Sequence, residues 1–187
     1  MLVADTGLQA LSGIDVGGTV RFTADFRSVV YRDPGTGFLS FLYQLTNTGG
    51  GTADSIGRIT TIDFGTPTVT DVGFCSACAD LLAGVVTYVD PDFVSRSGGS
   101  GSVIEFAYSV GGAHLAPLES SSVLIINTMS TLYAPGSTSV QDGGTVNANS
   151  FQPVDAAVPE PSTMGLALLG IAGLLALHRR RSASGRR

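Results

Sequence analysis

Apolar residues recur at every second position in several stretches of the first 154 residues, and this spacing limits the fold more than any other feature. The stretches 20–26, 39–45 and 104–110 carry apolar residues at every second position, mostly with polar or small side chains between them. Such alternation is the pattern of a β-strand with one buried face. Clusters of glycine, asparagine, proline and aspartate separate the stretches and predict turns, as at 47–51. An all-β domain is therefore expected.

The remaining strands follow from shorter apolar runs between turn signals. They are expected at 29–32, 57–64, 68–74, 84–90, 122–133 and 144–152. Within them, 123–126 is apolar on both faces, which favours a central place in a sheet. The segment 77–83 is the one candidate for a short helical turn. About nine strands with short turns predict an antiparallel β-sandwich, followed by a single hydrophobic helix at the C-terminus.

Charge is distributed unevenly along the 187 residues. All fifteen acids lie between Asp5 and Glu160, together with only five arginines, so this region carries a net charge of −10. The other five arginines follow residue 178, and there is no lysine. An acidic domain argues against nucleic acid as a partner, because phosphates need a basic surface. A basic end beside an apolar run indicates a membrane.

The C-terminal segment has three parts in a fixed order. We divide the chain into a body (1–154), a linker (155–158) and a tail (159–187). The tail opens with Pro159, Glu160 and Pro161, which keep the chain extended. A short transmembrane helix is expected over 163–177; its fourteen apolar residues span about 21 Å, less than the ~30 Å hydrocarbon core. A stop-transfer cluster follows, formed by Arg179, Arg180 and Arg181.

This order of triplet, short helix and arginine cluster closely resembles the PEP-CTERM sorting signal of Gram-negative bacteria, over residues 158–187. The resemblance implies recognition by an exosortase, a membrane-embedded, cysteine-protease-like enzyme linked to exopolysaccharide production. It also implies cleavage near the triplet, after passage through the inner membrane with the body on the periplasmic side. An ordinary C-terminal anchor with a proline hinge is the alternative.

The N-terminus does not show the signal peptide that an exported protein should carry. The first four residues are apolar, but Asp5 follows them directly, and no apolar segment of 7–15 residues comes next. We expect the start to be truncated, with another export route as the alternative.

Candidate sites within the body are few. Cys75 and Cys78 are the only cysteines, and a local disulfide is expected of an exported chain, ahead of a redox site. Closing so small a loop stabilises by about 2 kcal/mol in the chain-entropy model. Asp90 and Asp92 are the candidate calcium ligands, with a solvated turn as the simpler interpretation. His114 lies in a predicted loop without a nucleophile motif.

These features favour a non-catalytic surface or extracellular-matrix protein that an exosortase sorts and that associates with exopolysaccharide or biofilm. No cofactor is expected. A carbohydrate-binding module is the first alternative, and it would need exposed aromatics such as Tyr31, Tyr88 or Tyr133. A secreted hydrolase is the second alternative, which would need a pair of carboxylates that the sequence does not identify.

Overall fold

The computed structural model describes residues 1–51, 53–65, 69–84, 87–98, 102–108 and 114–154. These residues form strands, turns and loops, with no helix among them. They belong to a compact unit, Met1–Asp155, and the second unit, Ala156–Arg187, lies outside the described residues. In the described ranges no helix has the length and apolar character needed to cross a membrane. The predicted helix over 163–177 is outside them.

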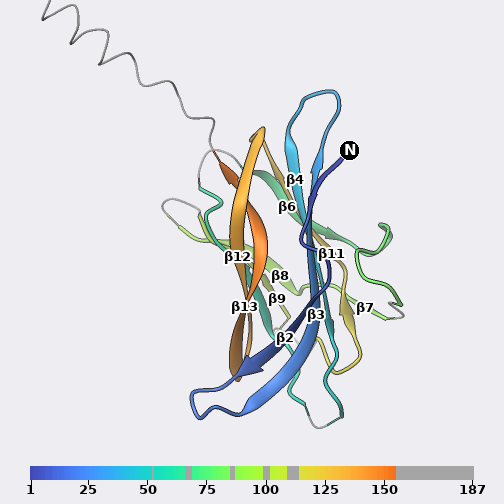
Figure 1. The fold of residues 1–187 in the computed structure, drawn as a ribbon, viewed down its shortest axis with the longest axis vertical. Helices are drawn as coiled ribbons and strands as arrows, with labels where there is room; N and C mark the ends of the chain where they lie inside the picture. Colours follow the sequence, from blue (N-terminus) through green and yellow to red (C-terminus); the bar gives the residue numbers. More distant parts are fainter. Residues whose placement is uncertain (52, 66–68, 85–86, 99–101, 109–113, 155–187) are drawn as a thin grey trace, which may run out of the picture. The chain divides into compact units, whose positions relative to one another are not determined.

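Thirteen strands make up the described unit (Figure 1). Their bounds are β1 (Leu2–Asp5), β2 (Gln9–Ile14), β3 (Val20–Arg32), β4 (Leu39–Asn47), β5 (Arg58–Thr61), β6 (Val69–Cys75), β7 (Tyr88–Val89), β8 (Phe93–Arg96), β9 (Ile104–Ala107), β10 (Ser120–Ser121), β11 (Val123–Thr128), β12 (Leu132–Asp142) and β13 (Gly144–Val154).

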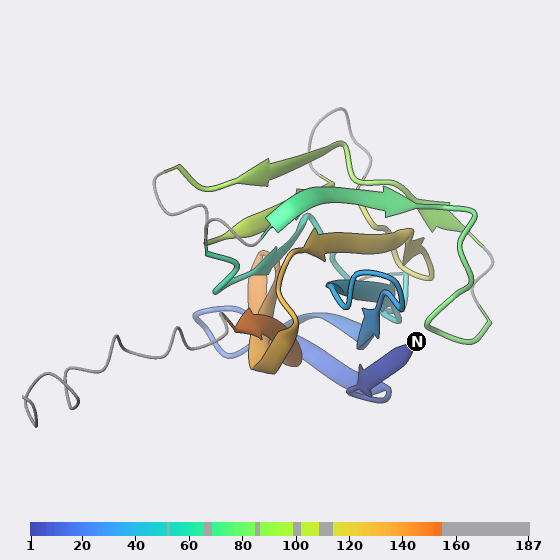
Figure 2. The same ribbon diagram turned by 90° about the horizontal axis from the view of Figure 1, so that it is seen from above.

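The strands are hydrogen-bonded into one sheet in the order β6-β11-β4-β3-β2-β13-β12-β5-β9-β8. β1 pairs with β3, and β10 pairs with β4 and, in parallel, with β7. The sheet curls around its own inner face, which Figure 2 shows from above. All-β architecture is thus confirmed. The prediction of about nine strands in two separate sheets is corrected to thirteen strands in one sheet.

The two halves of the sheet meet at one register pair, Thr145 of β13 with Ile14 of β2. Gly144 makes this close approach possible. A Cβ atom at Gly144 would lie 3.0 Å from backbone atoms of Gly13 and Ile14, closer than real Cβ contacts allow without a shift. The structure therefore has one continuous sheet where two were predicted, because β2 pairs with β13 at this glycine contact.

The inner face of the curled sheet forms the hydrophobic core. Phe41 lies at 0% exposure, and its ring packs edge-on against Phe64 with centroids 5.3 Å apart. Phe26 stacks on Tyr43 at 6.2 Å. The alternating stretches of the sequence account for much of this core, because their described apolar residues face inward, except for Val20, which is 54% exposed. Its other large members are Phe22, Leu39, Leu45, Ile56, Ile59, Ile104, Phe106 and Tyr108.

Several strand boundaries differ from the prediction. The expected strands 20–26 and 29–32 form one strand, β3, and 122–133 breaks into β11 and the start of β12. The segment 84–90 contributes only β7. Residues 123–126 lie in β11, between β6 and β4, as their two apolar faces predicted. The helical turn expected at 77–83 is wrong, since these residues form bends and turns held by contacts with the sheet.

Candidate functional site

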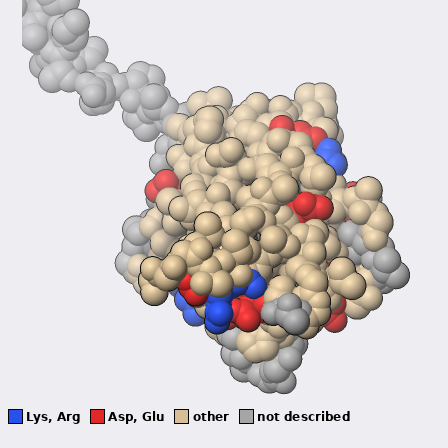
Figure 3. Space-filling model, turned by 60° about the horizontal axis from the view of Figure 1, so that its bottom comes forward, with Lys and Arg blue, Asp and Glu red and all other residues tan. Residues whose placement is uncertain are grey.

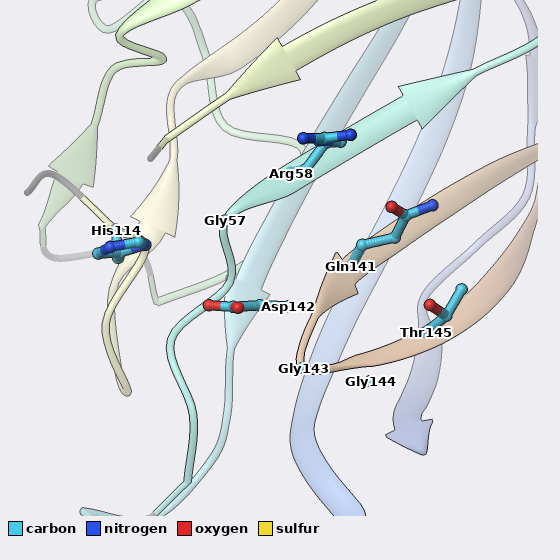
Figure 4. Close-up of a pocket in the computed structure, with 8 residues that line it drawn as sticks. All are labelled: Gly57, Arg58, His114, Gln141, Asp142, Gly143, Gly144 and Thr145. Carbon is cyan, nitrogen blue, oxygen red and sulfur yellow. The ribbon is translucent and has the colours of Figure 1, made fainter. Parts of the chain in front are cut away.

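A polar pocket of about 320 Å³ opens where the β12–β13 hairpin turns, at the lower end of the body in Figure 1. Three separate segments build it, and Figure 4 shows their side chains. The hairpin supplies one wall, the start of β5 another, and the segment after residue 113 the third. The lining residues are Gly57, Arg58, His114, Gln141, Asp142, Gly143, Gly144 and Thr145.

Asp142 is the central acceptor of this pocket. Its carboxylate points toward His114, with Gly57 between them (Figure 4). A Cβ atom at Gly57 would lie 3.7 Å from the Asp142 Oδ2 atom and 3.8 Å from the His114 Nδ1 atom, so a larger residue would crowd the gap. Among the described residues, the Asp142 carboxylate has no hydrogen bond or ion pair.

Burial raises the pKa of Asp142 above its ordinary value. The charges of nearby groups act in both directions: His114 and Arg21 lower this pKa, and Asp54 raises it. Desolvation is the largest cause, so the charged form of Asp142 is disfavoured in the folded chain. The site therefore holds a partly desolvated carboxylate, which nearby charges compensate only in part and to which no described residue donates a hydrogen bond.

Acids outnumber bases around the pocket. Arg21 is shared between Asp54, at 2.8 Å, and Asp15, at 3.9 Å. Arg58 is paired with Glu105 at 2.9 Å. Both arginines are therefore already neutralised, and Asp142 adds a further negative charge. Figure 3 shows the face at this end of the body: most of it is uncharged, and basic and acidic side chains adjoin at its lower left and upper right.

Replacing Asp142 with asparagine should stabilise the fold at pH 7 by less than about 1 kcal/mol and change nothing at pH 2–3. A carboxyl whose pKa is raised by folding is neutral in both states at low pH. As the pH rises through its unfolded and then its folded pKa, charging the buried group penalises the folded state. Urea denaturation of the wild type and of D142N at both pH values measures the difference.

Asp5 provides a control of opposite sign. Asp5 accepts hydrogen bonds from Arg27 at 3.0 and 2.5 Å, and these lower its pKa. The Asp5 carboxylate therefore stabilises the folded state at neutral pH, and this stabilisation is lost as the pH falls. Asp5→Asn should therefore cost about 0.5–1 kcal/mol at pH 7, as expected of a half-exposed ion pair. Equal losses from D142N and Asp5→Asn at pH 7 would contradict the desolvation assigned to Asp142.

A second feature is the loop that follows β6. Cys75 and Cys78 form a disulfide across it. The buried Gln44 side chain accepts hydrogen bonds from the amides of Leu81, at 2.7 Å, and Leu82, at 2.9 Å. Arg27 donates to the Leu81 carbonyl at 2.7 Å. These contacts hold Leu81 against the outer face of β3 and β11, beside Val29 and Val123.

The other residues singled out in the sequence lie apart from the pocket. Asp90 accepts a hydrogen bond from the Ser122 hydroxyl. Asp92 is exposed, and the described residues contain no group of three or more residues able to hold a metal ion. Tyr31 borders an apolar groove of about 440 Å³ beside the disulfide loop, Tyr88 donates to Asp80 at 2.7 Å, and Tyr133 packs on Phe151. These tyrosines do not form one platform.

Asp142, Gln141 and Arg58 were missed as site residues because they come from segments that the chain brings together only by folding. The run Asp142-Gly143-Gly144 is a turn signal and was the one indication in the sequence. It lies at the end of β12, a strand that the sequence did not predict. Gly143 adopts a positive φ of 58°, as such a turn requires. His114 was noted alone, and its acidic neighbour was not.

The sorting residues lie outside the described residues: Pro159, Glu160, Pro161 and the cluster Arg179, Arg180 and Arg181. Comparison with protein families gives a match there, since residues 157–181 fit the model of the PEP-CTERM protein-sorting motif. The chain carries a PEP-CTERM sorting signal. No curated protein and no solved structure matches the chain.

The motif implies processing by an exosortase and transit through the membrane to the cell surface or beyond in a Gram-negative bacterium. The match covers the C-terminal residues and says nothing of the body. What the body does must therefore be argued from its own residues, among them those that line the pocket beside Asp142.

Proposed function

We propose that this PEP-CTERM protein is a non-catalytic component of the cell envelope or extracellular matrix, associated with exopolysaccharide. The sorting motif at 157–181 carries the proposal, because it sends the acidic body out of the cell. In transit the body lies on the periplasmic side of the inner membrane, held by the tail. Exosortase cleavage near Glu160 then separates the body from its apolar segment.

The composition of the body supports this location. A net charge of −10 through residue 161 keeps an exported domain soluble in a hydrated matrix. The disulfide between Cys75 and Cys78 suits an oxidising compartment. Asp142 is the only carboxylate among the described residues that line the pocket, whereas glycoside hydrolysis uses a pair. That arrangement favours binding over the hydrolase alternative.

The matrix role is tested by fractionating two cultures of the host, one of them deleted for exopolysaccharide synthesis. We expect the body in the matrix fraction of the parent strain and in the culture medium of the deletion strain. A second exported protein without a sorting motif serves as the control for general leakage. If the body stays in the same fraction in both strains, association with exopolysaccharide is wrong.

A further inference from the structure

We propose that the pocket at the β12–β13 turn binds a positively charged amino sugar of the glucosamine class, with the Asp142 carboxylate accepting its ammonium group. This inference rests on the proposed association with polysaccharide and names the chemistry of the ligand. The pocket offers an unpaired acceptor, a surrounding excess of acids, and neutral polar groups suited to hydroxyls. Each of these is a property of the described residues.

The unpaired carboxylate is the first argument. Asp142 is half-buried at the pocket wall, and no described residue donates to it. A desolvated charge without a partner is costly, and natural folds keep such a group mainly where function uses it. A ligand cation would restore the lost solvation through charge-assisted hydrogen bonds. The fold thus has a specific acceptor ready for an ammonium group.

The surroundings select the sign of the ligand's charge. Two nearby arginines are paired with three acids, Asp15, Asp54 and Glu105, which leaves one negative charge. The carboxylate of Asp142 adds a second negative charge. An anionic sugar such as a uronate would be repelled. His114 faces Asp142 across the pocket (Figure 4). The charge balance favours a cation.

The neutral lining fits the rest of a sugar ring. Gln141 and Thr145 offer an amide oxygen and a hydroxyl, and the glycine at the turn, Gly143, is exposed. Hydroxyls both donate and accept, which matches this mixture. The volume of 320 Å³ is at the small end of ligand pockets, about 300–1,000 Å³, and suits one or two rings.

The position of the pocket also suits a matrix ligand. β13 runs from Gly144 at the pocket to Val154, where the body ends, over eleven residues or about 36 Å. The pocket and the exit of the chain toward the tail are therefore at opposite ends of one strand (Figure 1). The pocket is thus one strand length away from Val154, the last described residue before the tail.

The test uses the whole chain in detergent and isothermal titration calorimetry at pH 7 with three tetrasaccharides. These are the tetramers of glucosamine, of N-acetylglucosamine and of glucuronate. We expect the glucosamine tetramer to bind and the other two to bind at least tenfold more weakly. D142N should lower the affinity for the glucosamine tetramer about tenfold to hundredfold, the usual effect of losing a charge-assisted hydrogen bond.

Asp71→Asn is the matched control, because it removes the same charge from an exposed position of β6 that does not line the pocket. It should leave the affinity within twofold of the wild type. Equal binding of the N-acetylated tetramer, equal loss in both variants, or displacement of the sugar by millimolar calcium would each overturn the proposal. Matrix retention without glucosamine binding would remove this inference and leave the proposed function standing.

Discussion

Replacing Pro159, Glu160 and Pro161 together with alanine should stop the processing of the chain in its host. The motif at 157–181 implies processing by an exosortase, and we expect the two prolines to keep Glu160 extended ahead of the apolar run. Alanine is the strongest helix former, so the variant would extend the helix expected at 163–177 into the recognised site. On immunoblots the wild type should lose the mass of its tail, and the variant should keep it.

A triple substitution beyond the arginine cluster is the control. Ser182, Ser184 and Gly185 lie after residue 181, where the match to the sorting motif ends. Alanine at these three positions should leave processing intact. If both triple variants are cleaved as the wild type is, the Pro-Glu-Pro triplet is not the recognised element, and the tail would act as an ordinary anchor with a proline hinge.

Phe41→Ala should lower the free energy of unfolding of the body by about 3–5 kcal/mol. Phe41 is fully buried at the centre of β4, and its ring packs edge-on against Phe64, which approaches from the other half of the curled sheet. Truncation would remove this contact and leave a cavity that the two halves of the sheet cannot close. Urea denaturation of the purified chain, followed by near-ultraviolet circular dichroism, measures the loss.

Phe38 supplies the matched control, since it lies just before β4 with 37% of its surface exposed. Phe38→Ala removes the same atoms and should cost less than about 1 kcal/mol, because little transfer energy and no cavity are involved. Similar losses in the two variants would mean that Phe41 and Phe64 do not form the buried contact on which this description of the core depends.

The strands that the sequence predicted are those whose apolar face is continuous. β4, β9 and β11 bury their alternating or double-sided apolar residues, so the pattern and the structure agree. β3 was predicted as two pieces because Arg27 and Ser28 interrupt the pattern. In the structure β3 continues through these two residues, because both contact the N-terminal segment. Arg27 pairs with Asp5, and the Ser28 amide donates a hydrogen bond to the Thr6 hydroxyl at 3.0 Å.

β12 shows why other strands could not be predicted. Pro135 and Gly136 are turn signals, yet β12 pairs with β13 continuously from Leu132 to Asp142. The second neighbour, β5, contacts only Thr138–Gln141, so the proline lies where β12 has an open edge and its missing amide costs nothing. β1 and β2 are short, with 4 and 6 residues, and they also depend on their partner strands. Partner strands distant in the sequence, and not local propensity, determine these elements.

The tail could be recognised from the sequence alone, whereas the candidate pocket could not. The tail is a contiguous signal, read in order from Pro159 to Arg181, and its recognition needed no fold. The pocket depends on Gly57, His114 and Asp142 meeting across 85 residues of chain, a result of pairing between β5 and β12. No spacing rule in one sequence predicts that meeting, because hairpin order and register decide it.

The most direct test of the account is to follow the chain in its host after deletion of the exosortase. Mass spectrometry of membrane and extracellular fractions would identify the C-terminal peptide of the protein in each strain. In the parent strain we expect an extracellular body that ends near Glu160; in the deletion strain, an uncut chain held in the membrane fraction. An extracellular body with the same C-terminus in both strains would contradict exosortase sorting of this protein.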